Sequence, residues 1–260
     1  MSIPESLPFI MTGLSQKGHF PTNKISDGVL YKGYTVGDIW GYVTGGILQE
    51  GDFDGVGANG KPLYHGPYFK GGQAYPGYIW YQDLDHDGVI TTGLNTVDDP
   101  GDRKVIGNNA PRYRYNITAN FQYKGFDLDL MFQGVGKRDY WLSSTSSYWG
   151  NGAGSWEVYN NSWTPERTDA KFPMYGSGTG SYPQTGYLLD ASYIKLKQVI
   201  LGYTFPRALI NKIGLEKLRL NLAAYNLFTI SDMPKYYDAD YLSDAYPPKR
   251  TFSVGIQVGF

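Results

Sequence analysis

The chain has 260 residues, a formal net charge of −1 and no cysteine. The lack of cysteine excludes disulfide bonds, Cys-ligated zinc, iron–sulfur clusters and a thiol nucleophile, and a near-neutral charge without a basic cluster argues against a nucleic-acid partner. The 24 Tyr, 12 Phe, 6 Trp and 34 Gly favour a β-rich protein. The first residues, MSIPESLPFIMTG, show no signal-peptide pattern, so for an exported protein we expect the targeting signal upstream of Met1.

The first candidate strand covers Thr35–Leu48, although glycines interrupt it. A stronger one follows at Arg112–Tyr123, where apolar and polar residues alternate over twelve positions. Lys124-Gly125 then forms a predicted tight turn into residues 126–136, FDLDLMFQGVG, where the alternation continues. Together, the two segments predict a long antiparallel hairpin.

Three more long strands are predicted toward the end of the chain. Residues 192–205 alternate with a change of phase that predicts a β-bulge near Lys197-Gln198. A short helical or turn segment from Pro206 to Gly214 leads into residues 215–228, and the last strand covers residues 249–260. The alternation predicts one surface for Phe121, Phe132, Val254 and Ile256, and the opposite surface for Asn120, Gln133 and Gln257.

The connections between these strands alternate between short and long. Residues 124–125 and 206–214 are short, whereas 49–111, 136–189 and 231–248 are long. Transmembrane barrels have this asymmetry, with short periplasmic turns and long outer loops. Strands of about twelve residues also match a bilayer better than the usual strand of about 5 to 6. We therefore predict an all-β fold that forms a portion of an antiparallel transmembrane β-barrel. This portion has about six long strands, so the barrel is incomplete without upstream strands. A soluble β-sandwich is the alternative.

A possible cation site lies in the first long connection. The sequence DLDHDG places Asp83, Asp85 and Asp87 at positions 1, 3 and 5 of an EF-hand-like loop, with Gly88 at position 6 and the Val89 carbonyl at position 7. This pattern predicts calcium. Position 12 is Leu94, which is not an acid. The alternative is a solvated turn rich in aspartate.

Aromatic residues are frequent in the long connections. Trp80, Tyr81, Trp149 and Trp156 are candidates to stack on sugar rings, while the alternative for each is loop packing or an interfacial girdle. The three histidines are far apart in sequence, which argues against a catalytic or zinc role for His19, His65 and His86. Asp127 and Asp129 have i, i+2 spacing on a polar strand face, which fits a barrel wall better than a glycosidase pair. We predict that the protein is not an enzyme.

Several strings resemble, in order, the C-terminal part of the SusC/RagA family of TonB-dependent transporters. They are GDIWGYVTGGILQ, DLDHDGVI, DRKVIGNNAPRYRYNITANFQYKGFDLDLMFQGVG, SWTPERTDAKFP, ASYIKLKQVILGYTFP, LRLNLAAYNLF and TFSVGIQVGF. The resemblance implies that residues 34–260 are the C-terminal part of the barrel, after an uncertain segment 1–33. It also implies that the acid closing the calcium loop comes from Asp102, or else from Asp98 or Asp99.

The same resemblance implies a place and partners for the whole protein. These are the outer membrane of a Gram-negative, Bacteroidetes-like bacterium, a glycan or peptide substrate, a SusD-like surface lipoprotein, and a TonB complex contacted through a missing N-terminal region. Phe260 resembles the terminal aromatic that the outer-membrane assembly machinery reads; a simple interfacial anchor is the alternative. The competing function is a soluble, surface-exposed carbohydrate-binding β-module with a structural calcium, which would bury its apolar strand face.

Overall fold

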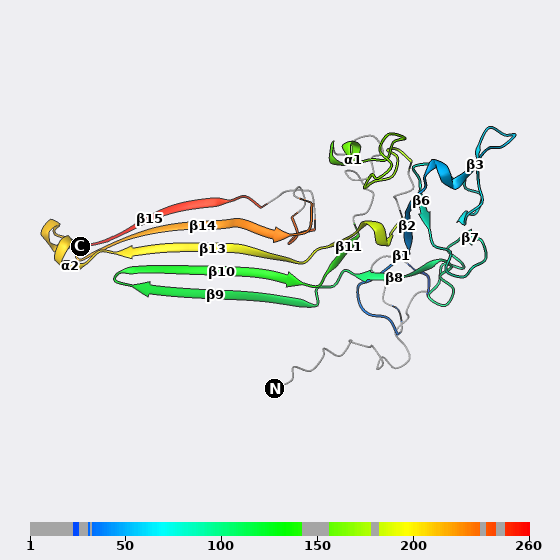
Figure 1. Ribbon diagram of the computed structural model, residues 1–260. Coiled ribbons are helices and arrows are strands. Elements are labelled where there is room, and N and C mark those ends of the chain that lie inside the picture. Colours follow the sequence, from blue (N-terminus) through cyan, green and yellow to red (C-terminus); the bar gives the residue numbers. More distant parts are fainter. Residues whose placement is uncertain are drawn as a thin grey trace. The chain divides into compact units, whose positions relative to one another are not determined.

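The computed structural model describes residues 23–25, 31, 33–141, 156–177, 182–234, 238–242 and 248–260 (Figure 1). The chain divides into two compact units. The loop unit comprises Met1–Ala110 and Tyr140–Leu188, and the strand unit comprises Pro111–Asp139 and Leu189–Phe260. None of the described helices is long and apolar enough to cross a membrane.

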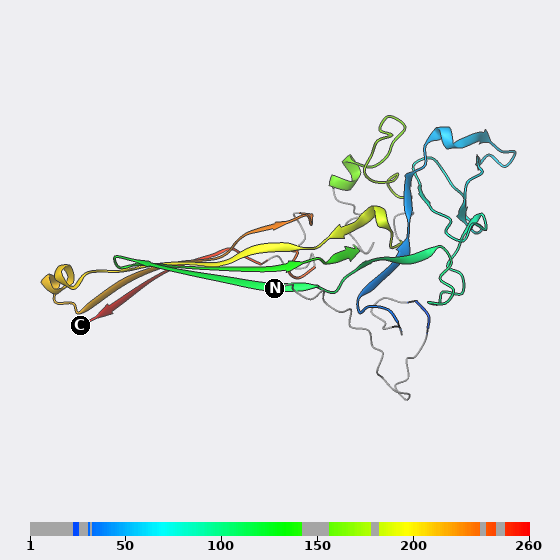
Figure 2. The same ribbon diagram turned by 60° about the horizontal axis from the view of Figure 1, so that its bottom comes forward.

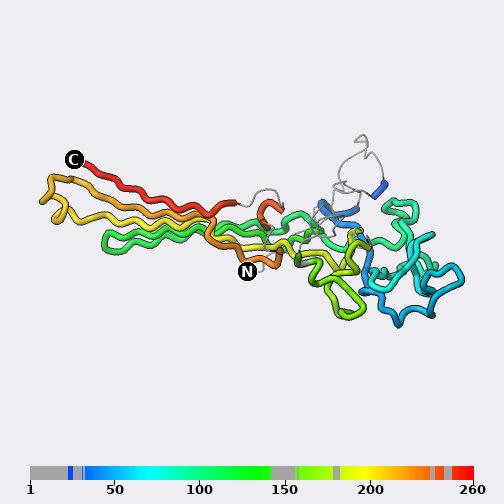
Figure 3. The backbone as a smooth tube through the Cα atoms, turned by 90° about the horizontal axis from the view of Figure 1, so that it is seen from above, coloured from blue at the N-terminus to red at the C-terminus, as the bar shows by residue number. Residues whose placement is uncertain are grey.

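The strand unit is built on one antiparallel sheet of five long strands, which lie side by side in Figures 1 and 3. Its order is β15-β14-β13-β10-β9. The strands are β9 (Tyr113–Tyr123), β10 (Phe126–Gly136), β13 (Tyr193–Thr204), β14 (Lys217–Ser231) and β15 (Thr251–Gly259). Five of the predicted long strands are therefore confirmed, with ends shifted by a few residues.

The register of the sheet fixes which side chains share a face, because directly paired residues point the same way. One continuous row across all five strands is apolar: Phe121, Leu128, Leu201, Leu222, Val254. The next row is mostly polar or small: Asn120, Asp129, Ile200, Ala223, Ser253. The predicted division into an apolar and a polar face is confirmed. On the apolar face, Phe121 is 58% exposed and Val254 is 71% exposed, so no described segment buries them.

The predicted bulge and turns are also present. The pairing of β13 with β10 shifts between Leu196 and Gln198, which face the adjacent residues Phe132 and Met131, so Lys197 is the extra residue. Lys124 and Gly125 both have positive φ in the tight turn. α2 (Arg207–Ile210) and η4 (Asn211–Ile213) form the other short connection, at the same end of the sheet. Figure 2 shows the five long strands of the sheet crossing one another in projection, as expected for a twisted sheet.

The loop unit consists of short strand pairs, most of them antiparallel. β1 (Asp38–Tyr42) pairs with β8 (Arg103–Asn108), β2 (Thr44–Ile47) with β6 (Ile79–Tyr81), and β3 (Phe53–Val56) with β4 (Pro62–Tyr64). β5 (Tyr68–Phe69) pairs in parallel with β7 (Val89–Ile90). The remaining elements are η1 (Glu50–Asp52), β11 (Asp139–Trp141), α1 (Trp156–Asn160), η3 (Thr185–Tyr187) and β12 (Leu188–Asp190), with β11 paired to β12.

The prediction of one long strand over Thr35–Leu48 is wrong. The segment forms β1 and β2, which pair with different partners and belong to the loop unit. The glycines explain the break, because Gly46 has φ 137° and the Trp80 ring lies against the position where a Gly45 side chain would be. The alternating pattern continues through the segment, but the pairing partner changes from β8 to β6.

We expect Gly45→Ala to destabilise the loop unit, because the new methyl group would overlap the Trp80 indole. The cost should be about 1 to 3 kcal/mol, as for other overpacked sites. Thermal unfolding of the complete protein measures it. Gly51→Ala is the matched control, since a Cβ there would meet nothing within 4 Å; equal stability of the two variants would contradict the packing argument.

Candidate functional site

The best-defined candidate site is a group of three carboxylates in the loop unit, which we call the acid cluster. Asp83, Asp85 and Asp102 each bring one carboxylate oxygen within 4.8 Å of the others. Two of them belong to the DLDHDG turn and the third lies just before β8. Oxygen atoms converging in this way are the ligands that a hard cation such as calcium prefers.

The backbone of the DLDHDG turn explains why its aspartates converge. The carboxylate of Asp83 accepts hydrogen bonds from the N–H groups of His86 at 2.7 Å and Gly88 at 2.8 Å. Asp85 accepts one from Asp87 N–H at 3.2 Å. His86 and Gly88 have φ of 64° and 84°, so the chain winds tightly around the first aspartate. The acid at position 1 is thereby fixed before any cation binds.

Asp102 differs from the other two because it is fully buried. Its two carboxylate oxygens accept hydrogen bonds from Leu84 N–H at 2.8 Å and Thr91 N–H at 2.7 Å. No described cationic side chain forms an ion pair with it. A buried carboxylate is costly unless a positive charge compensates it, so the donor set fits a bound cation.

The electrostatics of the turn follow from the same contacts. The Asp87 N–H lowers the pKa of Asp85, but desolvation and the negative charges of Asp102 and Asp87 outweigh this effect and leave that pKa raised. For Asp83, desolvation raises the pKa, but the hydrogen bonds from the Gly88 and His86 N–H groups outweigh this effect and leave the pKa lowered. The two acids of the turn, half-buried Asp83 and exposed Asp85, therefore differ in how readily they ionise.

The carboxylates of Asp87, Asp98 and Asp99, which were also predicted to contribute, are not part of the acid cluster. The Asp87 carboxylate accepts a hydrogen bond from Val89 N–H at 2.8 Å, within the same turn. Asp98 accepts one from the Asn23 side chain, and Asp99 accepts one from Leu94 N–H. Of the three acids proposed to close the loop, the structure brings Asp102 to the cluster.

The expectation that Tyr81 stacks on a substrate is corrected by its burial. Tyr81 is 0% exposed and packs against Tyr42 and Phe69, with ring centroids 5.2 Å away in both cases. Burial raises its pKa well above the usual value. Its neighbour Trp80 is half-buried and packs over Gly45. Strand alternation in β6 sends one ring into the core, which composition alone does not reveal.

Among the other aromatic candidates, Trp156 is 78% exposed. Its ring makes an edge contact with Tyr159, which makes another with Tyr175. These three rings form an exposed aromatic row on the loop unit. The remaining candidate, Trp149, lies outside the described residues, as do His19 and residues 1–22.

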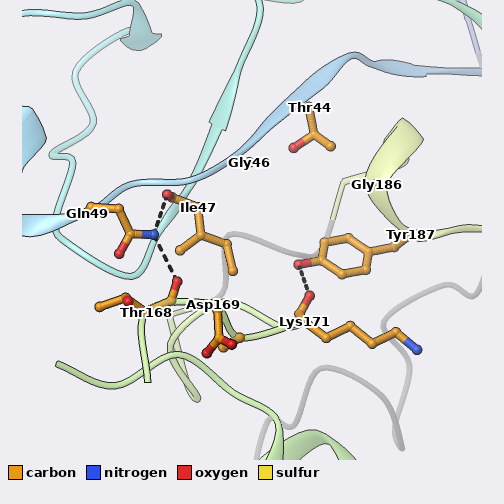
Figure 4. A pocket seen from close by; sticks show the side chains of 10 residues that line it. Thr44, Gly46, Ile47, Gln49, Thr168, Asp169, Lys171, Gly186 and Tyr187 are labelled. Atoms are coloured by element: carbon orange, nitrogen blue, oxygen red, sulfur yellow. Dashed lines mark hydrogen bonds between the residues drawn. The ribbon is translucent and has the colours of Figure 1, made fainter. Parts of the chain in front are cut away.

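Figure 4 shows a cavity in the loop unit, which has a volume of about 280 Å³ and a mixed polar and apolar lining. The Gln49 amide donates to the carbonyls of Ile47 at 2.9 Å and Thr168 at 3.2 Å, and the Tyr187 hydroxyl donates to the Lys171 carbonyl at 3.1 Å. These bonds connect the end of β2 and η3 to the segment around residues 168–171, so the polar groups named here serve the fold.

In the strand unit, the polar face holds charged contacts that the sequence did not indicate. Arg219 donates to Asp127 at 2.6 Å. This pairing supports a wall role for Asp127 over a catalytic one. Further along the face lies the ion-pair network, which we define as Lys195, Lys197, Asp238 and Asp240.

Phe260 follows directly after β15 and is 89% exposed. Its neighbour Gly259 accepts a hydrogen bond from Glu216 N–H at 2.9 Å, which fixes the end of the strand. The role of Phe260 as an assembly signal stays a prediction.

The chain is similar in sequence to TonB-dependent receptors. It is 30% identical to TonB-dependent receptor P3 of Formosa agariphila over 95% of this chain and 24% of that protein. It is 28% identical to receptor P26 of the same organism, over 69% of this chain and 19% of that protein. It is 26% identical to SusC of Bacteroides thetaiotaomicron, over 70% of this chain and 19% of that protein. The chain thus spans about a quarter or less of these relatives' length, and no family model matches it.

Solved structures confirm the fold. The RagAB peptide importer matches in its open-open state with a TM-score of 0.58, at 20% identity over 94% of this chain and 25% of that chain. Its closed-closed state matches with a TM-score of 0.59, at 20% identity over 93% of this chain and 25% of that chain.

The five-stranded sheet is therefore a portion of an antiparallel transmembrane β-barrel. The chain belongs with the SusC/RagA-type TonB-dependent receptors and corresponds to a barrel segment of such a protein.

Proposed function

We propose that this chain forms part of the wall and outer loops of a TonB-dependent outer-membrane transporter in a Gram-negative bacterium of the Bacteroidetes type. In this proposal the complete transporter imports a glycan or a peptide beneath a SusD-like surface lipoprotein, draws energy from the TonB complex and is inserted by the outer-membrane assembly machinery. The chain then guides a substrate and makes or breaks no bond, so it is not an enzyme.

One observation carries the proposal, which is the exposed apolar face of the five-stranded sheet. Aliphatic and aromatic rows run across every strand of that face, and Phe252, Val254 and Ile256 of β15 are each more than 65% exposed. Lipid is the solvent in which such a face is stable. A soluble carbohydrate-binding module would cover it with a second layer, and no described segment does so.

The relatives support the choice of partners and substrate class. The matching solved structures are of a peptide importer, RagAB, and one matching sequence is SusC. The similarity covers about a quarter of those chains, so the whole transporter's substrate and lipoprotein partner are part of the proposal.

We also propose that the acid cluster binds one calcium ion. Asp83, Asp85 and Asp102 would supply carboxylate oxygens, and the Val89 carbonyl follows in the turn as a further candidate. The ion would neutralise the buried Asp102 and join the DLDHDG turn to the start of β8. Its role is structural, because the cluster combines a tight turn with a buried carboxylate and connects two segments of the loop unit.

The lack of cysteine in this chain allows a direct test of the lipid-facing surface. We expect Ser253→Cys to react with a water-soluble maleimide in intact outer membranes, because Ser253 is on the polar face. Val254→Cys, one residue further on the same strand, should be protected by lipid and react only after denaturation. Labelling is measured on the receptor that carries this chain.

Asn120→Cys and Phe121→Cys give a matched second pair on β9, at the opposite edge of the sheet. The membrane proposal requires the same polar and apolar difference in both pairs. Equal native labelling of Val254→Cys and Ser253→Cys, or recovery of the receptor in the soluble fraction, would refute it.

A further inference from the structure

A cavity of about 340 Å³ lies on the polar face of the sheet, and we call it the Arg114 pocket. It lies at the end away from the Lys124–Gly125 turn, next to the start of β9 and the end of β10. Its floor comes from the two hairpin strands and from β13, and its polar lining groups are Arg114, Asn116, Gln133, Arg138, Tyr193 and Asp240. All belong to the strand unit.

One side of the pocket is held in place by the ion-pair network. Lys195 is 1% exposed and its Nζ lies 3.0 Å from the Asp238 carboxylate. Asp238 in turn accepts a hydrogen bond from Asp240 N–H at 2.8 Å. The Tyr193 hydroxyl donates to Asp240 at 2.6 Å, and Lys197 Nζ lies 3.3 Å from the same carboxylate. Asp240 is therefore fixed against the sheet.

The charges of this region do not cancel. Lys195 and Lys197 balance Asp238 and Asp240 within the network. Burial raises the pKa of Asp240, but the Tyr193 hydroxyl and the two lysines outweigh it and keep that pKa lowered, so the carboxylate stays ionised and engaged. Arg114 then adds a positive charge at the pocket, and the Arg138 side chain, which has interactions of its own, also lines it. Arg114 is exposed and forms no ion pair with a described carboxylate.

We propose that the Arg114 pocket binds a carboxylate group of the transported ligand. Arg114 and Arg138 would supply the guanidinium groups, which bind carboxylates through paired hydrogen bonds. Asn116 would hydrogen-bond to adjacent hydroxyl or peptide groups of the ligand through its amide. Gln133 donates through Nε2 to the Tyr193 hydroxyl and to Asp240, so it would offer its amide oxygen. This inference rests on the proposed function, because only in a barrel does the polar face line the transport path.

A carboxylate can come from a uronic acid of a glycan or from the C-terminus of a peptide. Two pairs of probes separate these sources. One pair is a glucuronate-containing oligosaccharide and its carboxyl-reduced form, and the other is a short neutral peptide with a free C-terminal carboxylate and the same peptide as its amide. Binding is measured by calorimetry on the detergent-purified, folded receptor.

We expect at least one carboxylate probe to bind more tightly than its neutral form, and Arg114→Gln to weaken that probe by roughly tenfold or more. Arg138→Gln should act in the same direction. Arg112→Gln is the matched control, because it removes the same charge two residues earlier, just before β9 and outside the pocket lining. The neutral forms should bind equally to all four proteins.

Equal binding of acid and neutral probes in both pairs, or an equal loss in Arg112→Gln and Arg114→Gln, overturns the inference. The inference is also overturned if both carboxylate probes fail to bind. Heat-dependent gel migration shows that each variant is folded. The outcome is separable from the membrane test, because a folded, lipid-embedded receptor that ignores the carboxylate defeats this inference alone, whereas soluble recovery defeats the proposed function.

Discussion

Replacing Asp102 with asparagine should lower calcium affinity at the acid cluster by at least about 100-fold. Mutation of residues that only hydrogen-bond to metal ligands already lowers metal affinity by about 10- to 100-fold, and Asp102 is a direct ligand in this proposal. The loss has a direct cause, because Asp102 is the buried member of the cluster and supplies one of its three negative charges. Calcium titration of the purified receptor by calorimetry measures the change. We expect the protein without the substitution to bind one calcium ion per chain at this site.

Asp87→Asn is the matched control for this experiment. It makes the same chemical change in the neighbouring DLDHDG turn, but its carboxylate accepts a hydrogen bond from Val89 N–H and lies outside the cluster. It should therefore retain most of the affinity. Thermal unfolding in a calcium chelator separates a ligand effect from a folding effect, because Asp102→Asn also weakens one of two backbone hydrogen bonds. Equal affinity losses in both variants, or no calcium binding before substitution, would contradict the proposed site.

The long strands were predictable because a strand's face is a local property. Alternation in residues 112–136 assigns each side chain to a side before any partner is known, and the register of β9 with β10 agrees at every paired position. The phase change near Lys197 predicted the bulge for the same reason. The prediction of one long strand over residues 35–48 failed because the sequence pattern indicates only which face each residue is on. The change of pairing partner depends on Trp80 and other residues distant in sequence.

The candidate sites were predictable only where they are local. The DLDHDG turn gave two of the three clustered acids, but the sequence left Asp98, Asp99 and Asp102 open, because the choice depends on how the inserted residues fold back onto the turn. The partners Lys195 and Asp238 are 43 residues apart and have no shared motif. Likewise, Trp80 and Tyr81 are adjacent aromatic residues that the sequence does not distinguish. Only the packing of the loop unit shows that Tyr81 is the buried one.

Lys195→Met should strongly destabilise the packing of residues 238–242 on the polar face. The Lys195 side chain is 2% exposed and lies 3.0 Å from Asp238 and 3.7 Å from Asp240. Methionine keeps the length of the side chain but leaves two partly buried carboxylates with less compensation. Removing one partner of a buried pair costs about 3 to 5 kcal/mol. Urea unfolding of the folded receptor, together with the rate of proteolysis after β14, measures this cost.

Lys197→Met is the matched control, because the Lys197 side chain is 29% exposed and, among the described residues, forms an ion pair with Asp240 alone. Solvent screens that pair, so its loss should cost less than about 1 kcal/mol. Adding Asp238→Asn to Lys195→Met removes the uncompensated charge, so the double variant should be more stable than the sum of the single effects by about 1 kcal/mol or more. If the two lysine variants were equally stable, or if the double variant were simply additive, Lys195 would not hold this segment through its charge.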